Sequence, residues 1–334
     1  MKPYHPISKF FVIFVSVFSL ANCWSGNIFA QNKTQLSADY KSNLNIKVPG
    51  LEIRKITVDG KERSYLVHIP PNLAAQKTAV PVVLAYHGAM TNGMIMAALT
   101  GLNEKADTSK FVVVYPNGTG ANDINLYFNA FQTHAESKAV DDVAFTSKLL
   151  DDLGTVVNID TKRIFATGMS NGGMMCYKLA AELSDRIAAI APVAGTMAID
   201  ITTAKPKRAI PIIHFHGTSD HIVKYDGDNN AAFNFAGIKS VDETIDAWVR
   251  IDGIQPAAPK TTPLPVKVED GTHISRIDYG SGKNKSEIVL YKIENGGHTW
   301  PGRPMPVVKL GLSTSNISAN DLMWDFFVKH PKSD

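Results

Sequence analysis

Hydrophobic positions along the chain alternate between short apolar runs and segments with helical spacing. Short apolar runs rich in β-branched residues predict buried strands, and apolar residues three or four apart predict amphipathic helices. The predicted strands are 81–88, 111–116, 163–167, 187–193, 210–216 and 287–293. The predicted helices are 141–153, 174–183, 241–251 and 318–328.

Strands and helices that alternate in this way predict an α/β fold, a mostly parallel sheet with helices on both faces. Before them, residues 51–56 and 64–71 flank an Asp59-Gly60 turn and predict an antiparallel hairpin at the sheet edge. Residues 255–285, rich in Pro, Lys, Gly and Ser, are expected to be the longest irregular stretch. The length of 334 residues suits one large domain, predicted to span residues 48–334.

Residues 1–30 have the pattern of an export signal. Lysines precede the apolar run 10–20, which is too short to span a membrane comfortably and is typical of a signal peptide. Cleavage after Ile28-Phe29-Ala30 predicts a secreted or periplasmic protein. The alternative is Leu20-Ala21-Asn22-Cys23, which is similar to a bacterial lipobox and would give a membrane-anchored lipoprotein with its lipid on Cys23.

Composition narrows the classes of partner. The formal net charge is +3, and no basic run marks any predicted element, which argues against nucleic acid. The cysteines are Cys23 and Cys176, so the mature chain is expected to have no internal disulfide, with Cys176 a buried hydrophobe. Residues 31–47, polar and without a period, are predicted to form a flexible leader. Nothing in the sequence indicates an obligate protein partner.

The most informative stretch is Gly168-Met169-Ser170-Asn171-Gly172-Gly173, which reads G-x-S-x-G. A predicted buried strand precedes it and a helical pattern follows it. This is the context of the nucleophile elbow, the strand–turn–helix that exposes the catalytic serine of an α/β-hydrolase. Ser170 is therefore the predicted nucleophile. The alternative is a serine- and glycine-rich turn without a catalytic role.

An activated serine needs a base, and the base needs an orienting acid. In α/β-hydrolases the three follow the chain order serine, acid, histidine. Asp220, just after a predicted strand, is the predicted acid, and His298, just after the last predicted strand, is the predicted base. Both lie at carboxyl ends of strands, where an open parallel sheet collects its functional residues. The alternatives are a turn-capping aspartate and a loop histidine bonded to backbone.

Ester hydrolysis also needs two backbone N–H donors for the oxyanion. Asn171 is predicted to supply one and Ala89 the other, with Met90 as the second choice for the latter. His214 and His216 share a strand face, but no carboxylate or thiol cluster offers a third metal ligand. No metal or other cofactor is therefore expected.

Four motifs carry a family resemblance: Gly168-Met-Ser-Asn-Gly-Gly-Met-Met, Ala191-Pro-Val-Ala-Gly, His216-Gly-Thr-Ser-Asp followed by Val223-Lys-Tyr-Asp-Gly, and Gly297-His-Thr-Trp-Pro-Gly. From about Leu51 to His330 the chain resembles the secreted polyhydroxybutyrate depolymerase and feruloyl-esterase-like group of the α/β-hydrolase superfamily. The resemblance implies a triad of Ser170, Asp220 and His298. It implies hydrolysis of hydroxyalkanoate esters, polymeric or oligomeric, or of feruloyl and acetyl esters on plant polysaccharide.

The predicted function is thus an exported serine esterase that acts through an acyl-enzyme on a small-molecule or polymeric ester. The alternatives are an acyltransferase on the same fold and a non-catalytic surface lipoprotein. Depolymerases of solid polymer commonly carry a polymer-binding module after the catalytic domain, and here the closing helix is followed by few residues, so soluble or oligomeric esters are expected. Trp300 is predicted to contact substrate, while Tyr115, Phe128 and Phe131 suit an acyl pocket or the core.

Overall fold

The computed structural model describes residues 48–71, 73, 78–130, 140–197, 206–227, 238–255, 258–305 and 308–332. The predicted signal peptide, the leader and Phe131 lie outside these residues. Within the described ranges, no helix is both long enough and apolar enough to cross a membrane.

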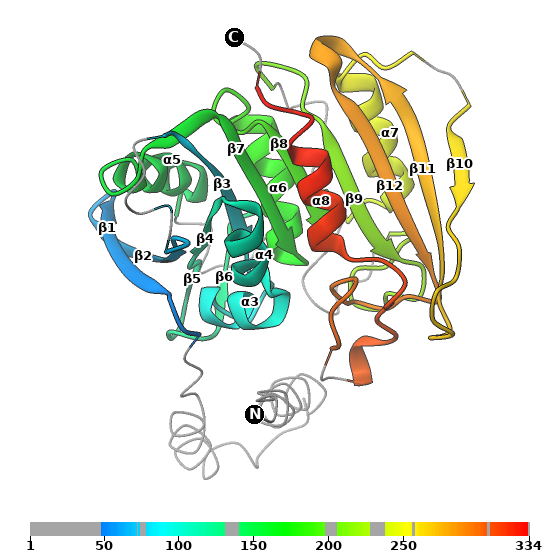
Figure 1. Cartoon of the computed structure of the whole chain (residues 1–334), viewed down its shortest axis with the longest axis horizontal. Helices are drawn as coiled ribbons and strands as arrows, with labels where there is room; N and C mark the ends of the chain where they lie inside the picture. The colour runs from blue at the N-terminus through cyan, green and yellow to red at the C-terminus, as the bar shows by residue number, and fades with distance from the viewer. Residues whose placement is uncertain are drawn as a thin grey trace.

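A ten-stranded sheet forms the centre of the fold, with strand order β1-β2-β4-β3-β7-β8-β9-β12-β11-β10 (Figure 1). From β4 to β12 in this order, neighbouring strands are parallel, and the strands beyond them at both ends are antiparallel. The strands are β1 (Glu52–Val58), β2 (Lys61–His68), β3 (Val80–Tyr86), β4 (Val112–Pro116), β7 (Ile159–Met169), β8 (Ala189–Val193), β9 (Ile212–Gly217), β10 (Lys260–Pro263), β11 (His273–Ser281) and β12 (Glu287–Glu294). A separate small sheet pairs β5 (Thr119–Gly120) with β6 (Leu126–Tyr127).

Helices cover both faces of the large sheet, and each face has its own buried apolar cluster. One cluster includes residues of α5 (Asp142–Leu153), α6 (Asn171–Glu182) and α7 (Val241–Ile251). The other includes residues of α3 (Gly93–Thr100), α4 (Leu102–Ser109) and α8 (Ala319–Phe327). The short 3₁₀ helices are η3 (Lys283–Lys285) and η4 (Val308–Leu310). Because the central strands are buried on both faces, most of their residues are apolar, which is why they could be recognised in the sequence.

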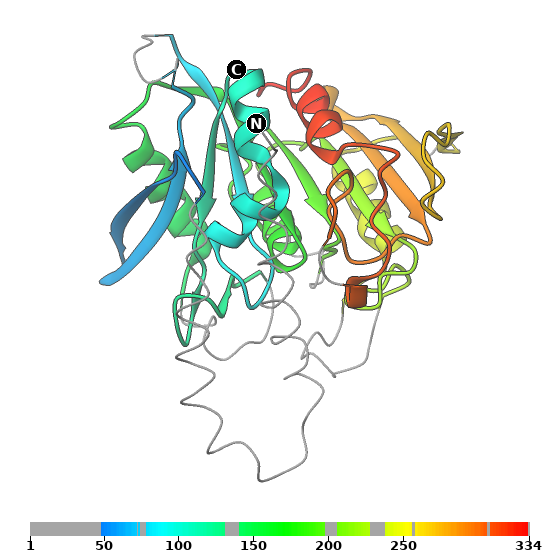
Figure 2. The same ribbon diagram turned by 60° about the horizontal axis from the view of Figure 1, so that its bottom comes forward.

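The predicted parallel sheet, the helices on both faces and the opening hairpin are confirmed. The hairpin turns at Asp59 and Gly60, with φ of 50° and 76°, the positive values that a tight two-residue turn requires. The prediction that residues 255–285 are irregular is wrong, because β10 and β11 lie there and extend the sheet beyond β12. Figure 2 shows these two strands at the end of the sheet opposite to the hairpin of β1 and β2. Most side chains of β10 and β11 are exposed or half-buried, so no apolar run marks them.

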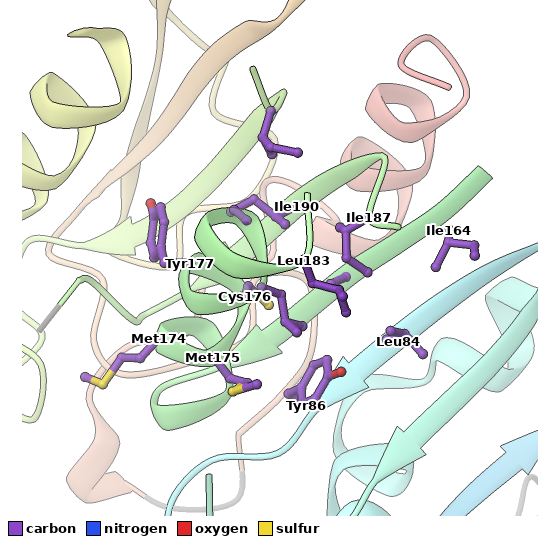
Figure 3. Packing of buried hydrophobic residues seen from close by; sticks show 14 of the residues in the cluster. Leu84, Tyr86, Ile164, Met174, Met175, Cys176, Tyr177, Leu183, Ile187 and Ile190 are labelled. Atoms are coloured by element: carbon purple, nitrogen blue, oxygen red, sulfur yellow. The ribbon is translucent and has the colours of Figure 1, made fainter. Parts of the chain in front are cut away.

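Cys176 lies in the core, as predicted. Its side chain projects from α6 and is fully buried in the same cluster as Leu183, Ile187 and Ile190 (Figure 3). Burial raises the pKa of the Cys176 thiol well above its ordinary value. The thiol therefore stays protonated and packs as a small hydrophobe.

Candidate active site

Ser170 occupies the sharp turn between β7 and α6. Its φ of 58° and ψ of −121° form a backbone conformation that a residue with a side chain rarely adopts. The glycines of the motif allow close packing: a Cβ on Gly172 would lie 2.1 Å from Tyr86 O, and one on Gly168 would lie 2.5 Å from Gly172 O. The strained residue is thus the serine itself, and the glycines give room for the strand and helix to approach. Strain of this kind gathers at functional sites.

Ser170, Asp220 and His298 follow strands whose carboxyl ends meet at one edge of the sheet. In Figure 1 the arrowheads of β7 and β9 point toward the lower side of the molecule, where the loop with η4 also lies. Three backbone hydrogen bonds of 2.9 Å connect these strand ends: Ser170 N–H to Val193 O, Ala194 N–H to Phe215 O, and Thr218 N–H to Ile293 O. Pairing between parallel strands therefore gathers residues that are far apart in the sequence.

Asp220 and His298 are in direct contact, with 2.7 Å between Asp220 Oδ2 and His298 Nδ1. The other carboxylate oxygen, Oδ1, accepts the backbone N–H groups of Ile222 at 2.8 Å and Val223 at 2.9 Å. Burial on its own would raise the pKa of Asp220, but His298 and these donors outweigh it and hold the pKa below its usual value. The carboxylate fixes the proton of a neutral His298 ring on Nδ1. Nε2 is then the unprotonated nitrogen, as a general base requires.

The loop that carries His298 is held by the segment around η4. Gly297 N–H donates to Leu312 O at 2.9 Å, and His298 N–H donates to Leu310 O at 2.7 Å. A Cβ on Gly297 would lie 2.0 Å from Leu310 O, so the two segments pack this closely only with glycine at that position. The glycine before the histidine is therefore part of what places the imidazole.

The predicted oxyanion donors flank Ser170. Asn171 is the first residue of α6, and the loop after β3 passes close by: a Cβ on Gly88 would lie 3.5 Å from Ser170 Cβ. Met90, the second choice, already donates its N–H to Leu126 O at 3.0 Å. Within the part of the chain that the structure describes, no residue accepts the N–H of Ala89. This arrangement favours Ala89 over Met90 as the second donor.

Side chains around this loop hold it in place. The amide of Asn171 clamps Phe128: Oδ1 accepts the Phe128 N–H at 2.7 Å, and Nδ2 donates to Phe128 O at 3.2 Å. His87 is buried, and burial lowers its pKa to about 4, so the ring is neutral. Its Nε2 accepts the Gly118 N–H at 3.0 Å, so the proton is on Nδ1, which donates to Gly88 O at 2.7 Å. His87 thus braces the loop and is not available as a base.

Trp300 is placed in the core rather than in a pocket. Its side chain is 0% exposed, and its indole N–H donates to Asn320 Oδ1 at 2.9 Å. A ring without exposed surface offers no face to a substrate, which speaks against the predicted contact. Tyr115 and Phe128 are also fully buried and belong to the core clusters. These large aromatic side chains are thus buried, as such residues usually are.

The other polar groups near the triad differ in accessibility. Asp226 is exposed, and Asp228 lies outside the described residues. His216 Nε2, by contrast, is buried 3.6 Å from Asp220 Oδ2, a neighbour that sequence reasoning missed. The only sequence signal was the pair His214 and His216, read as two residues on one strand face. Among the described residues, no group of three or more His, Cys, Asp or Glu side chains could hold a metal ion.

Comparisons with known proteins agree with the resemblance. A family model described as phospholipase/carboxylesterase matches residues 74–236. NocK of Nocardia uniformis subsp. tsuyamanensis, named as an esterase, is 27% identical over 285 residues, 82% of each chain. Feruloyl esterase B of Piromyces equi is 27% identical over 71% of this chain and 42% of its own length. Poly(3-hydroxyalkanoate) depolymerase C of Paucimonas lemoignei is 27% identical over 65% of this chain and 60% of its own length.

Solved structures agree on the fold. The acetyl xylan esterase from Aspergillus awamori superposes with a TM-score of 0.56 at 15% identity, over 83% of this chain and 99% of that chain. A thermostable esterase gives a TM-score of 0.53 at 14% identity, over 86% of this chain and 64% of that chain. At such low identity these likenesses bear on the fold alone.

Proposed function

Since the chain belongs to the α/β-hydrolase superfamily and is a carboxylic ester hydrolase, we propose that Ser170, Asp220 and His298 are its catalytic triad. The observation that supports this most directly is the 2.7 Å hydrogen bond between His298 Nδ1 and Asp220 Oδ2, at the same sheet edge as the strained turn of Ser170. The chain order serine, acid, histidine is the order of the superfamily.

The reaction would proceed through an acyl-enzyme. Ser170 Oγ attacks the ester carbonyl carbon while His298 Nε2 takes the hydroxyl proton, and the carbonyl oxygen becomes an oxyanion held by the N–H groups of Asn171 and Ala89. As the C–O bond breaks, His298 gives that proton to the departing alcohol. Water then attacks the acyl-serine, His298 takes and returns a proton again, and the carboxylic acid leaves. Asp220 stabilises the imidazolium in each half-reaction.

The substrate class is part of the proposal. The named relatives comprise a feruloyl esterase and a polyhydroxyalkanoate depolymerase, so carboxylic esters of hydroxyalkanoate oligomers or polymers, or feruloyl and acetyl esters, are the candidates. We also propose that the protein is exported, on the strength of the lysines and the apolar run before residue 30. The mass of the mature N-terminus from the native host would distinguish cleavage after Ala30 from lipidation at Cys23.

A labelling experiment tests the triad. A fluorophosphonate should modify Ser170, and Ser170→Ala should abolish both labelling and hydrolysis of p-nitrophenyl acetate while leaving thermal melting nearly unchanged. The matched control is Ser184→Ala, which removes another buried serine hydroxyl, the acceptor of the Lys207 N–H, and should keep full activity. Labelling of a different serine, or an active Ser170→Ala variant, would overturn the assignment.

A substrate panel tests the ester class: hydroxybutyrate oligomers, methyl ferulate, acetylated xylan and p-nitrophenyl acetate. Each is assayed with and without an added alcohol acceptor. Release of free acid that does not depend on the acceptor supports a hydrolase. Product that forms only with the acceptor would instead make the protein an acyltransferase.

A further inference from the structure

Behind Asp220, toward the buried interior, polar side chains form a continuous row. Tyr177 Oη lies 2.8 Å from His214 Nδ1, His214 Nε2 lies 3.1 Å from His216 Nδ1, and His216 Nε2 lies 2.8 Å from Val223 O. Tyr177 comes from α6 and the two histidines from β9, and all three are at most 1% exposed. The two imidazole rings are stacked, with 5.3 Å between their centroids.

The last acceptor fixes the direction of every hydrogen bond in the row. A backbone carbonyl only accepts, so His216 Nε2 carries a proton. Burial lowers the pKa of both histidines, so each ring is neutral and holds one proton. His216 Nδ1 is therefore an acceptor, His214 Nε2 donates to it, and His214 Nδ1 accepts the hydroxyl proton of Tyr177. Every N–H and O–H in the row points toward the turn that carries Asp220.

We propose that Tyr177, His214 and His216 are positioning residues that fix Asp220 for its role toward His298. The inference rests on the proposed function. His216 Nε2–H holds Val223 O, and the N–H of Val223 donates to Asp220 Oδ1, so this bond adds a side-chain tie between the Asp220 turn and β9, beside the backbone bond from Asp220 N–H to Gly217 O. His216 Nε2 also lies 3.6 Å from Asp220 Oδ2, the oxygen that binds His298, and its N–H presents a positive dipole to that oxygen.

The opposite arrangement of protons is disfavoured by the surroundings. If His216 were protonated on Nδ1, the lone pair on Nε2 would face two acceptors, Val223 O and the Asp220 carboxylate. Buried lone pairs that face each other without a proton cost free energy, and the bond from His216 to Val223 O would be lost. The hydroxyl of Tyr177, at the far end of the row, completes this direction by donating to His214 Nδ1.

The first test needs only the native sequence. NMR of protein labelled with ¹⁵N in its histidine rings reports which ring nitrogen carries the proton. The expected result is Nε2–H for both His214 and His216 at neutral pH, with His216→Gln identifying the second signal. A proton on Nδ1 of His216 would overturn the proposal.

The second test compares two amides at position 216. In His216→Gln the side-chain NH₂ can replace Nε2–H as a donor to Val223 O, whereas in His216→Asn it is too short to reach. Because a misplaced catalytic group costs up to about a hundredfold, kcat for p-nitrophenyl acetate should fall about tenfold to a hundredfold in His216→Asn and much less in His216→Gln. KM should stay constant, since the row lies behind the acid and does not touch substrate.

A matched control comes from the far end of the sheet. His68 is also a buried strand histidine with two partners, Gly50 O and Asp107, and His68→Gln should leave kcat unchanged. Equal kcat values for His216→Asn and the native protein, or equal losses in the Asn and Gln variants, would overturn the positioning role. Those outcomes leave the triad intact as long as Ser170→Ala is inactive, whereas an active Ser170→Ala variant would instead remove the proposed function.

Discussion

Replacement of Asp220 by asparagine tests the triad at its most buried member. The amide keeps an oxygen to accept the N–H groups of Ile222 and Val223, so the turn should stay folded. Its NH₂ group would meet the Nδ1–H of His298 where 2.7 Å now separates donor and acceptor. Two donors cannot remain this close, so the imidazole must move its proton to Nε2. A protonated Nε2 cannot take the proton of Ser170.

The size of the effect follows from this change of tautomer. The same substitution in a serine protease lowers turnover by about four orders of magnitude. For Asp220→Asn we therefore expect kcat to fall on the order of a thousandfold or more, at least ~4 kcal/mol in the activation barrier, with KM little changed. Steady-state hydrolysis of p-nitrophenyl acetate measures both constants, and thermal melting checks the fold.

Asp226→Asn is the matched control for this prediction. Asp226 is an exposed carboxylate of the same loop, and its substitution should cost little in kcat. An inactive Asp226→Asn variant beside an active Asp220→Asn variant would contradict the assignment of Asp220 as the acid. In that case the hydrogen bond between His298 and Asp220 has no catalytic role.

Three further predictions concern other parts of the molecule. Burial raises the pKa of Asp252 from 3.8 to about 7, so the folded protein holds this proton more tightly than the unfolded chain. The stability of the native protein should therefore fall as pH rises from about 4 to about 7. In melting curves, the melting temperature of Asp252→Asn relative to that of the native protein should rise over this pH range and stay constant above about pH 7. Gly297→Ala should lower kcat strongly because a Cβ there would displace the segment around Leu310. Gly60→Ala is the control: a Cβ at that position would meet no atom within 4 Å, and kcat should stay unchanged. Equal kcat values for the two variants would show that the close packing at Gly297 is not needed. Trp300→Phe should lower the melting temperature with KM unchanged, because the ring is fully buried, and a raised KM in a stable variant would restore Trp300 as a substrate contact.

Much of the fold could be predicted because its centre is buried on both faces. Strands such as β3 and β4 are apolar runs, and the motif at Ser170 marks its own strand, turn and helix. The strands β10 and β11 escaped prediction because sheet pairing, not burial, holds them: β11 pairs along β12, and most of its side chains are exposed or half-buried. Helices α3 and α4 are short, eight residues each, and α4 has few apolar positions, so neither has a clear period.

The candidate site also contains a part that the sequence predicts and a part that it does not. Ser170, Asp220 and His298 were predicted from local motifs and chain order. All three follow strands that end at one sheet edge, and Asp220 is bonded to His298. The surroundings of the site could not be read locally, because they depend on contacts distant in sequence. The indole of Trp300 meets Asn320, and the row behind Asp220 joins α6 to β9. Proximity to His298 in the sequence says nothing about which way a ring points.

The position of His298 depends on the register of β12, and the pattern of apolar residues alone does not fix that register. Ile288 and Leu290 pack in one cluster and Val289 and Ile293 in the other, so a strand apolar on both faces could slip by one residue at little cost in buried area. Lys292 opposes such a slip. It is half-buried, and its ammonium lies 4.9 Å over the Tyr225 ring, on the face of His216.

A slip by one residue would turn this ammonium to the opposite face, where Phe215 and Tyr291 are stacked in an apolar cluster. An unpaired charge buried there would cost several kcal/mol. The same slip would move the loop after β12 by about 3.3 Å along the sheet, more than enough to break the contact between His298 and Asp220. Through the register of its strand, Lys292 helps to set where His298, the proposed base, lies.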